Sequence, residues 1–129
     1  MAIAVTAVYA AILGIYFFTL SFYVSAVRAK TGVGLGDGGN AQMLVAMRRH
    51  GNTAEFTPFA LLLMALAEAM GFGFAWLHAC GVLLVAGRLI HPFGVAEDGG
   101  WFPARVIGQL ATYAAIVVPG GFILWVSLS

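Results

Sequence analysis

The sequence predicts an all-α integral membrane protein: a single domain (residues 1–129) built as a bundle of four transmembrane helices. Three observations lead to this prediction. Apolar residues make up 62% of the chain and charged residues only 9%, whereas a soluble domain carries roughly 25% charged residues. Four long apolar segments are separated by breaks rich in glycine and proline, and all six basic residues lie in or beside two of the three connections. A chain with so little polar surface must face lipid.

The four predicted spans have the length that a bilayer requires, because about 20 helical residues cross the hydrocarbon core. The first covers about residues 3–27 and carries no charge. It lacks the basic start of a signal peptide and exceeds the usual apolar region, so we expect a retained helix. The second covers about 42–70 and has a polar first half, the third covers about 74–90, and the fourth about 103–128.

The basic residues orient the predicted bundle. With four spans, the glycine-rich first connection (31–40) and the third connection (92–103) emerge on the same side. All six basic residues flank these two connections: Arg28, Lys30, Arg48, Arg49, Arg88 and Arg105. Because cytoplasmic loops carry the excess of Lys and Arg, we expect loops one and three in the cytoplasm and both termini on the opposite side.

Several other classes of function find no support. The net charge of +1 comes without a basic patch, so we expect no nucleic-acid partner. No His, Cys, Asp or Glu cluster has the spacing of metal ligands, so no metal site is predicted. A transporter or channel needs a polar path through the membrane, and the far halves of the segments are nearly free of polar groups.

Ionisable residues at membrane depth are candidates for function. Arg48, Asn52 and Glu55 are spaced i, i+4, i+7 and therefore share one face of the second helix. A cation, an amide and a carboxylate together suit a zwitterionic, peptide-like ligand. The alternative is an internal ion-pair ladder that only ties helices together. Glu68 lies near the turn at residues 71–73, where the membrane interface explains it, and we assign it no chemistry.

Two further places carry cations. Arg88 and His91 are i, i+3 neighbours at the end of the third segment, and His91 is either a ligand contact or a helix cap. Arg105 follows Pro103 in the first turn of the fourth segment, where a cation opposes the helix dipole. A bound anion, a substrate thiolate or a lipid phosphate would compensate it.

The string Arg48-x-x-x-Asn52-x-x-Glu55-x-x-Pro58 resembles the signature of the MAPEG family, the membrane-associated proteins in eicosanoid and glutathione metabolism. The resemblance covers nearly the whole chain, including a Gly-Arg-x-x-His element at Arg88 and an arginine early in the fourth segment. The LGDGGN loop before the second segment is similar to the small bacterial branch of the family.

The resemblance implies a homotrimer in a bacterial inner membrane that binds glutathione, as co-substrate, at subunit interfaces near the cytoplasmic end. The implied glutathione-binding residues are Arg48, Asn52, Glu55, Arg88, His91 and Arg28. Arg105 is implied as the catalytic residue that stabilises the glutathione thiolate.

The expected function is that of a glutathione-dependent transferase or peroxidase acting on lipophilic electrophiles. Two positions depart from the family pattern: Val95 stands where relatives carry a tyrosine that touches glutathione, and Val106 where a serine often follows the arginine. These departures favour the alternative, a non-catalytic membrane ligand-binding or scaffold protein on a MAPEG-like frame.

Overall fold

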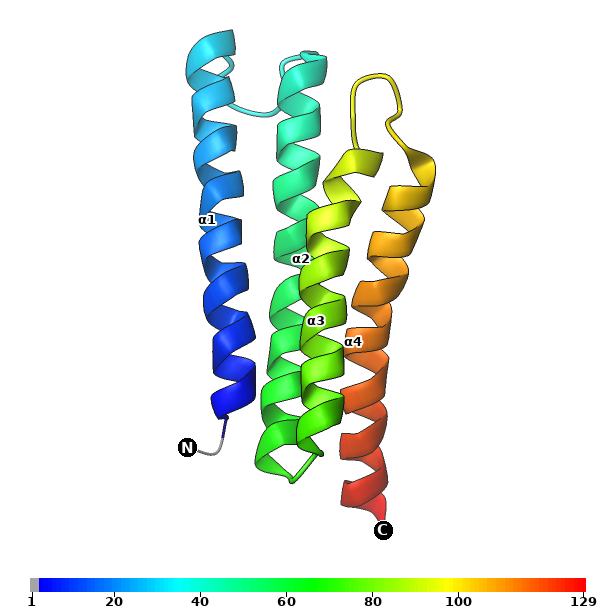
Figure 1. Ribbon diagram of the computed structural model, residues 1–129. Helices are drawn as coiled ribbons and strands as arrows, with labels where there is room; N and C mark the ends of the chain where they lie inside the picture. Colours follow the sequence, from blue (N-terminus) through cyan, green and yellow to red (C-terminus); the bar gives the residue numbers. More distant parts are fainter. Residues whose placement is uncertain (1–2) are drawn as a thin grey trace.

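The structure, a computed structural model, describes residues 3–129 as a bundle of four long helices (Figure 1). The helices are α1 (Ala4–Thr31), α2 (Ala41–Ala69), α3 (Phe74–Ile90) and α4 (Phe102–Leu128), and a short 3-10 helix, η1 (His91–Gly94), follows α3. Successive helices run in opposite directions, so loops one and three lie at the same end, here called the loop end. The α2–α3 turn, the start of α1 and the end of α4 lie at the other end, here called the terminal end. The predicted all-α four-helix fold is confirmed.

Local sequence explains where these helices begin and end. Gly32 closes α1 with φ of 71°, a left-handed conformation that favours glycine. Asn40 caps α2, because its Oδ1 accepts a hydrogen bond from the Met43 N–H at 2.9 Å. Gly71 turns the chain between α2 and α3 with φ of 89°. The sequence placed the first span at 3–27, but the helix itself continues to Thr31 because no glycine or proline lies between Val27 and Gly32.

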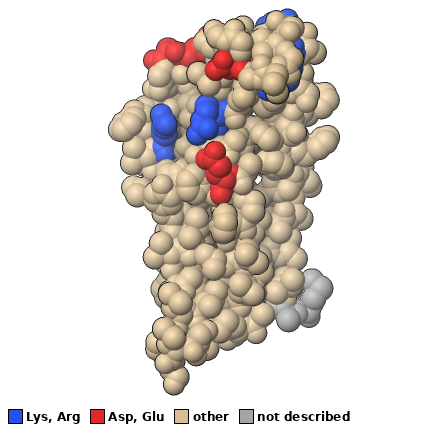
Figure 2. Space-filling model, turned by 180° about the vertical axis from the view of Figure 1, so that it is seen from behind, with Lys and Arg blue, Asp and Glu red and all other residues tan. Residues whose placement is uncertain are grey.

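The outer surface of the bundle suits lipid. Within residues 3–129, three helical segments are long and apolar enough to cross a membrane: Ala4–Thr31, Phe74–Gly94 and Phe102–Leu128. Helix α2 is not among these apolar segments, because its first half is polar. It nevertheless packs against both α1 and α4 along the bundle. Large apolar side chains such as Phe18, Trp76 and Trp125 are about two-thirds exposed. On the face shown in Figure 2, charged side chains gather toward the loop end and the terminal half is uncharged.

The main apolar core lies between all four helices toward the terminal end. Its buried members are Val5, Tyr9, Leu13, Ala60, Met64, Leu77, Cys80, Leu84 and Ala115. A second, smaller cluster of Val27, Met43 and Ala46 joins α1 to α2 near the loop end.

Glu68 fastens α2 to the start of α1. Its two carboxylate oxygens accept hydrogen bonds from the backbone N–H groups of Val5 at 2.7 Å and Thr6 at 2.8 Å. These N–H groups have no partner within a helix, and a negative charge there complements the helix dipole. Glu68 therefore has a structural role that the sequence did not reveal.

Candidate functional site

A polar cavity of about 310 Å³ opens near the loop end between α2, η1 and α4. Five of the seven predicted site residues contribute to its wall, and three further residues complete it. The lining residues are Arg48, Asn52, Glu55, Phe56, His91, Arg105, Gln109 and Tyr113. Residues from three separate parts of the sequence thus converge on one space, here called the polar cavity.

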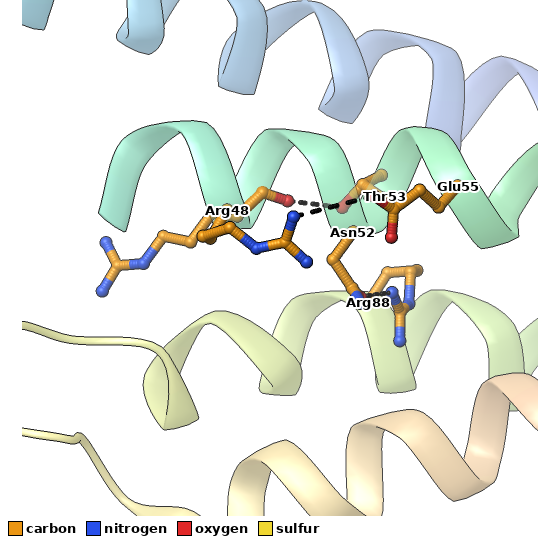
Figure 3. Close-up of polar contacts among 6 residues, drawn as sticks. Arg48, Asn52, Thr53, Glu55 and Arg88 are labelled. Atoms are coloured by element: carbon orange, nitrogen blue, oxygen red, sulfur yellow. Dashed lines mark hydrogen bonds and ion pairs between the residues drawn. The ribbon is translucent and has the colours of Figure 1, made fainter. Parts of the chain in front are cut away.

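Helix α2 presents Arg48, Asn52 and Glu55 along one side (Figure 3), as their spacing predicts. Arg48 Nη1 lies 3.7 Å from Glu55 Oε1, and the two side chains are 57% and 53% exposed. An ion pair this open contributes only about 0–1 kcal/mol. Both charges therefore remain available to a ligand that offers better partners.

Arg88 lies behind the wall of the polar cavity. It is 1% exposed, and its guanidinium donates to Asn52 Oδ1 at 2.5 Å, to the Gly108 carbonyl at 3.2 Å and to Gln109 Oε1 at 3.4 Å. Figure 3 shows Arg88 facing Asn52 from α3. The bond between them ties α2 to α3.

Glycines bring α3 and η1 against α4 and so place two site residues. A Cβ on Gly87 would lie 2.7 Å from the Gly108 carbonyl oxygen, and a Cβ on Gly94 would overlap the backbone of Arg105. Only glycine permits such close approach. His91 follows directly after α3 and is 5% exposed, and this packing places both His91 and Arg105 on the cavity wall.

The structure does not bring Arg28 to the polar cavity. Its Nη1 donates to the carbonyl groups of Val33 at 3.2 Å and Gly36 at 3.0 Å, which holds loop one in place. Arg49 performs a similar function for loop three, since its Nε donates to the Val95 carbonyl at 2.8 Å. The glutathione-binding role of Arg28 stays a prediction.

Sequence reasoning missed Phe56, Gln109 and Tyr113. Gln109 and Tyr113 follow Arg105 at i+4 and i+8, so helical periodicity alone places all three on one face of α4. Tyr113 also packs edge-to-face on Phe56, with ring centroids 5.8 Å apart. That periodicity was the signal that would have identified the two polar residues.

An apolar groove of about 260 Å³ adjoins the polar cavity on α4. The groove and the cavity share Arg105, Gln109 and Tyr113, while Phe102, Val106 and Leu110 line only the groove. The shared side chains thus form a boundary between a polar space and a surface suited to hydrocarbon. A polar ligand and an apolar ligand can approach Arg105 from its two sides.

The chemistry of the polar cavity is that of a binding site for a charged, peptide-like molecule. It offers two guanidinium groups, one carboxylate, two amides, an imidazole and a phenol. Guanidinium groups recognise carboxylates, and a nearby cation favours a thiolate over a thiol. A thiol-containing peptide would use all of these properties.

The fold and the cavity define a class: a small integral membrane bundle with an arginine-lined polar site at one end. Comparison with known proteins then gives the family. The model of the MAPEG family matches residues 6–125, and the chain belongs to that family.

Named relatives agree with this assignment. The inner membrane protein YecN of Escherichia coli K12 is 36% identical over 114 residues, which is 88% of this chain and 86% of that protein. The protein of the same name from Escherichia coli O6:H1 (strain CFT073) is similar to the same extent. No solved structure matches the chain significantly.

Proposed function

We propose that this protein is a glutathione-dependent membrane transferase or peroxidase acting on lipophilic electrophiles. The observation that carries the proposal is the convergence of Arg48, Asn52, Glu55, His91 and Arg105 on one polar cavity. Glutathione has two carboxylates, one ammonium group and one thiol, and the cavity offers guanidinium groups for a carboxylate and a thiolate and a carboxylate for the ammonium group. The apolar groove beside Arg105 supplies a route for a second substrate dissolved in lipid.

In the proposed reaction Arg48 binds a carboxylate of glutathione, Glu55 binds its ammonium group, and Asn52 and His91 contact the peptide. Arg105 stabilises the thiolate, which is the reactive nucleophile. In transfer, the sulfur forms a bond to an electrophilic carbon as the leaving group departs. In reduction, the sulfur attacks the terminal oxygen of a hydroperoxide, the O–O bond breaks and an alcohol leaves, which gives a glutathione sulfenic acid. The thiol of a second glutathione then attacks that sulfur, water leaves, and the disulfide forms.

The setting of the reaction is also part of the proposal. The relatives named inner membrane protein support the same location for this chain, with loops one and three in the cytoplasm, where the basic residues gather. Family resemblance supports a homotrimer, in which Arg28 of one subunit contributes to glutathione binding.

The test is glutathione binding by calorimetry on detergent-purified protein and on Arg48→Ala and Glu55→Ala variants. We expect the parent to bind and both variants to lose most of the affinity. Lys30→Ala is the matched control, because Lys30 is a cation at the loop end that does not line the polar cavity. A parent that does not bind glutathione contradicts the proposal.

The second candidate is a non-catalytic ligand-binding or scaffold protein. Val95 and Val106 favour it, since both replace hydroxyl-bearing residues of the family pattern. Purified protein that binds glutathione but does not react with any of a panel of aryl halides and lipid hydroperoxides would establish this candidate instead.

A further inference from the structure

The guanidinium of Arg88 dictates how two amide side chains are oriented. It donates to Asn52 Oδ1 at 2.5 Å and to Gln109 Oε1 at 3.4 Å. A guanidinium has five N–H donors and no acceptor, so only the oxygen of each amide can face it. The NH2 group of each amide must therefore point away from Arg88.

Both amides lie on the wall of the polar cavity, whereas Arg88 does not. The Gln109 Nε2 atom is buried and has no hydrogen-bond partner within residues 3–129. A buried donor without an acceptor destabilises the structure until an acceptor arrives. The two amides on the wall are thus held from behind by a buried cation that binds their oxygens and leaves their NH2 groups free of Arg88.

We infer that Asn52 and Gln109 form an amide pair that donates hydrogen bonds to a carboxylate of the bound thiol peptide, and that Arg88 acts as a positioning residue for this pair. The inference rests on the proposed function and names the chemistry that the site recognises. It assigns Gln109 a binding role and moves Arg88 from a direct ligand contact to a supporting position.

A carboxylate is the acceptor that fits this wall best. Arg48 and Arg105 add positive charge around the amide pair, and Glu55 is the one carboxylate among the lining residues. The positive charge of buried Arg88, which forms no ion pair within the described chain, lies behind both amides and polarises them toward a negative ligand. A neutral ester in the same place would gain less from these donors.

The first experiment observes the amide pair directly. The chain has two glutamines, Gln42 and Gln109, and two asparagines, Asn40 and Asn52. Protein labelled with 15N in these side chains would be titrated with glutathione in detergent and followed by NMR. We expect the NH2 signals of Gln109 and Asn52 to shift. Gln42 and the helix-capping Asn40 serve as internal controls that do not shift.

The second experiment alters the donor while keeping its shape. Gln109→Glu retains an oxygen for Arg88 but replaces the NH2 group with a second oxygen that repels a carboxylate. We expect glutathione to bind about tenfold more weakly, as loss of a charge-assisted hydrogen bond predicts. The affinity of Gln109→Glu for the diester of glutathione should fall much less. The control variant Gln42→Glu should bind both ligands as tightly as the parent does.

A third variant tests the positioning role. Arg88→Lys keeps the charge but removes the planar fork that holds two amides at once. We expect the Gln109 and Asn52 signals to move already in the ligand-free protein, together with weaker glutathione binding and a smaller preference for the acid over the diester. If Arg88 serves folding alone, Arg88→Lys would lower the stability of the protein without changing its preference for glutathione over the diester.

The outcomes separate this inference from the proposed function. If the parent binds neither glutathione nor its diester, the proposed function fails and the inference fails with it. If the parent binds glutathione while Gln109→Glu retains the parent's affinity and its preference for the acid, only the inference is overturned. The inference is supported if glutathione shifts only the side-chain NMR signals of Asn52 and Gln109, and if Gln109→Glu has a smaller preference for glutathione over its diester.

Discussion

Gly87 and Gly108 meet backbone to backbone, and this contact brings α3 and α4 close enough for the Arg88 guanidinium to reach the Gly108 carbonyl at 3.2 Å. A Cβ on Gly108 would lie 2.6 Å from the Gly87 carbonyl oxygen and 2.8 Å from the His91 Cβ. Small residues at helix contacts in membranes permit such close packing. The glycine pair therefore supports both the fold and the position of the site.

The first prediction is that Gly108→Ala destabilises the protein and weakens glutathione binding. The added methyl group must push α3 away from α4, and such overpacking costs about 1–3 kcal/mol. The same displacement moves His91 and the Arg88 hydrogen bonds out of register. Thermal unfolding in detergent and calorimetry would measure the two effects.

Gly121→Ala is the matched control for this change, because a Cβ at Gly121 meets nothing within 4 Å and alanine is the better helix former. It should leave stability and binding unchanged or slightly improve stability. If the two alanine variants have the same stability and the same affinity for glutathione, the close α3–α4 contact does not determine either property.

The second prediction concerns Glu68 and the start of α1. Glu68→Leu removes both acceptors of the Val5 and Thr6 N–H groups. Loss of a helix cap costs about 1 kcal/mol, which corresponds to roughly fivefold faster opening. Hydrogen exchange should therefore accelerate at these two amides and remain unchanged in the middle of α4. Unchanged exchange at Val5 and Thr6 would contradict the capping role.

The fold was predictable because each of its determinants is local in the sequence. Long uncharged segments, the glycines of loop one and the basic residues beside two connections define four helices and their relative directions. On α2, the spacing of Arg48, Asn52 and Glu55 also places them on one face without any tertiary information. The structure agrees with both predictions.

The remainder of the site depends on packing, which sequence patterns do not contain. Arg88 is a predicted ligand contact, and the sequence does not show that the close approach of two glycines buries it behind the cavity wall. Glu68 appeared to be an interfacial residue, because nothing in the sequence shows that the first turn of α1 lies beside it. Arg28 contacts loop-one carbonyls whose positions follow from the loop's turn geometry.

The third prediction is that Tyr9→Phe lowers stability modestly and Gly81→Ala lowers it more. The Tyr9 hydroxyl lies 2.7 Å from His78 Nδ1, and its ring occupies the space that a Cβ on Gly81 would need. Removing the hydroxyl loses its hydrogen bonds with the His78 ring and the His78 carbonyl, each worth about 0.5–1.5 kcal/mol, whereas the methyl group displaces the whole ring.

Thermal unfolding of the two single variants and of the double variant would measure this difference. Because both changes act on one contact, their effects should not add. Additive losses would indicate that Tyr9 and Gly81 contribute independently. Glutathione binding should be unaffected, since this contact lies toward the terminal end, away from the polar cavity.

The fourth prediction, which depends on the proposed function, is that Arg105→Ala still binds glutathione but loses thiolate formation. Arg105 lies where the polar cavity meets the apolar groove, on the boundary that it forms with Gln109 and Tyr113. A guanidinium beside a thiol stabilises the charged form and lowers the thiol pKa. Removing it raises the pKa of the bound thiol, so thiolate absorbance should appear only at higher pH.

Arg105→Lys should retain part of the effect, because the charge remains while the geometry changes. The pH at which half of the bound glutathione is ionised should therefore follow the order parent, then lysine variant, then alanine variant, from lowest to highest. The rate of conjugation to an aryl halide at neutral pH should follow the reverse order. If all three proteins ionise glutathione at the same pH, Arg105 has no part in the thiol chemistry, and its charge serves a lipid phosphate or the substrate carboxylates instead.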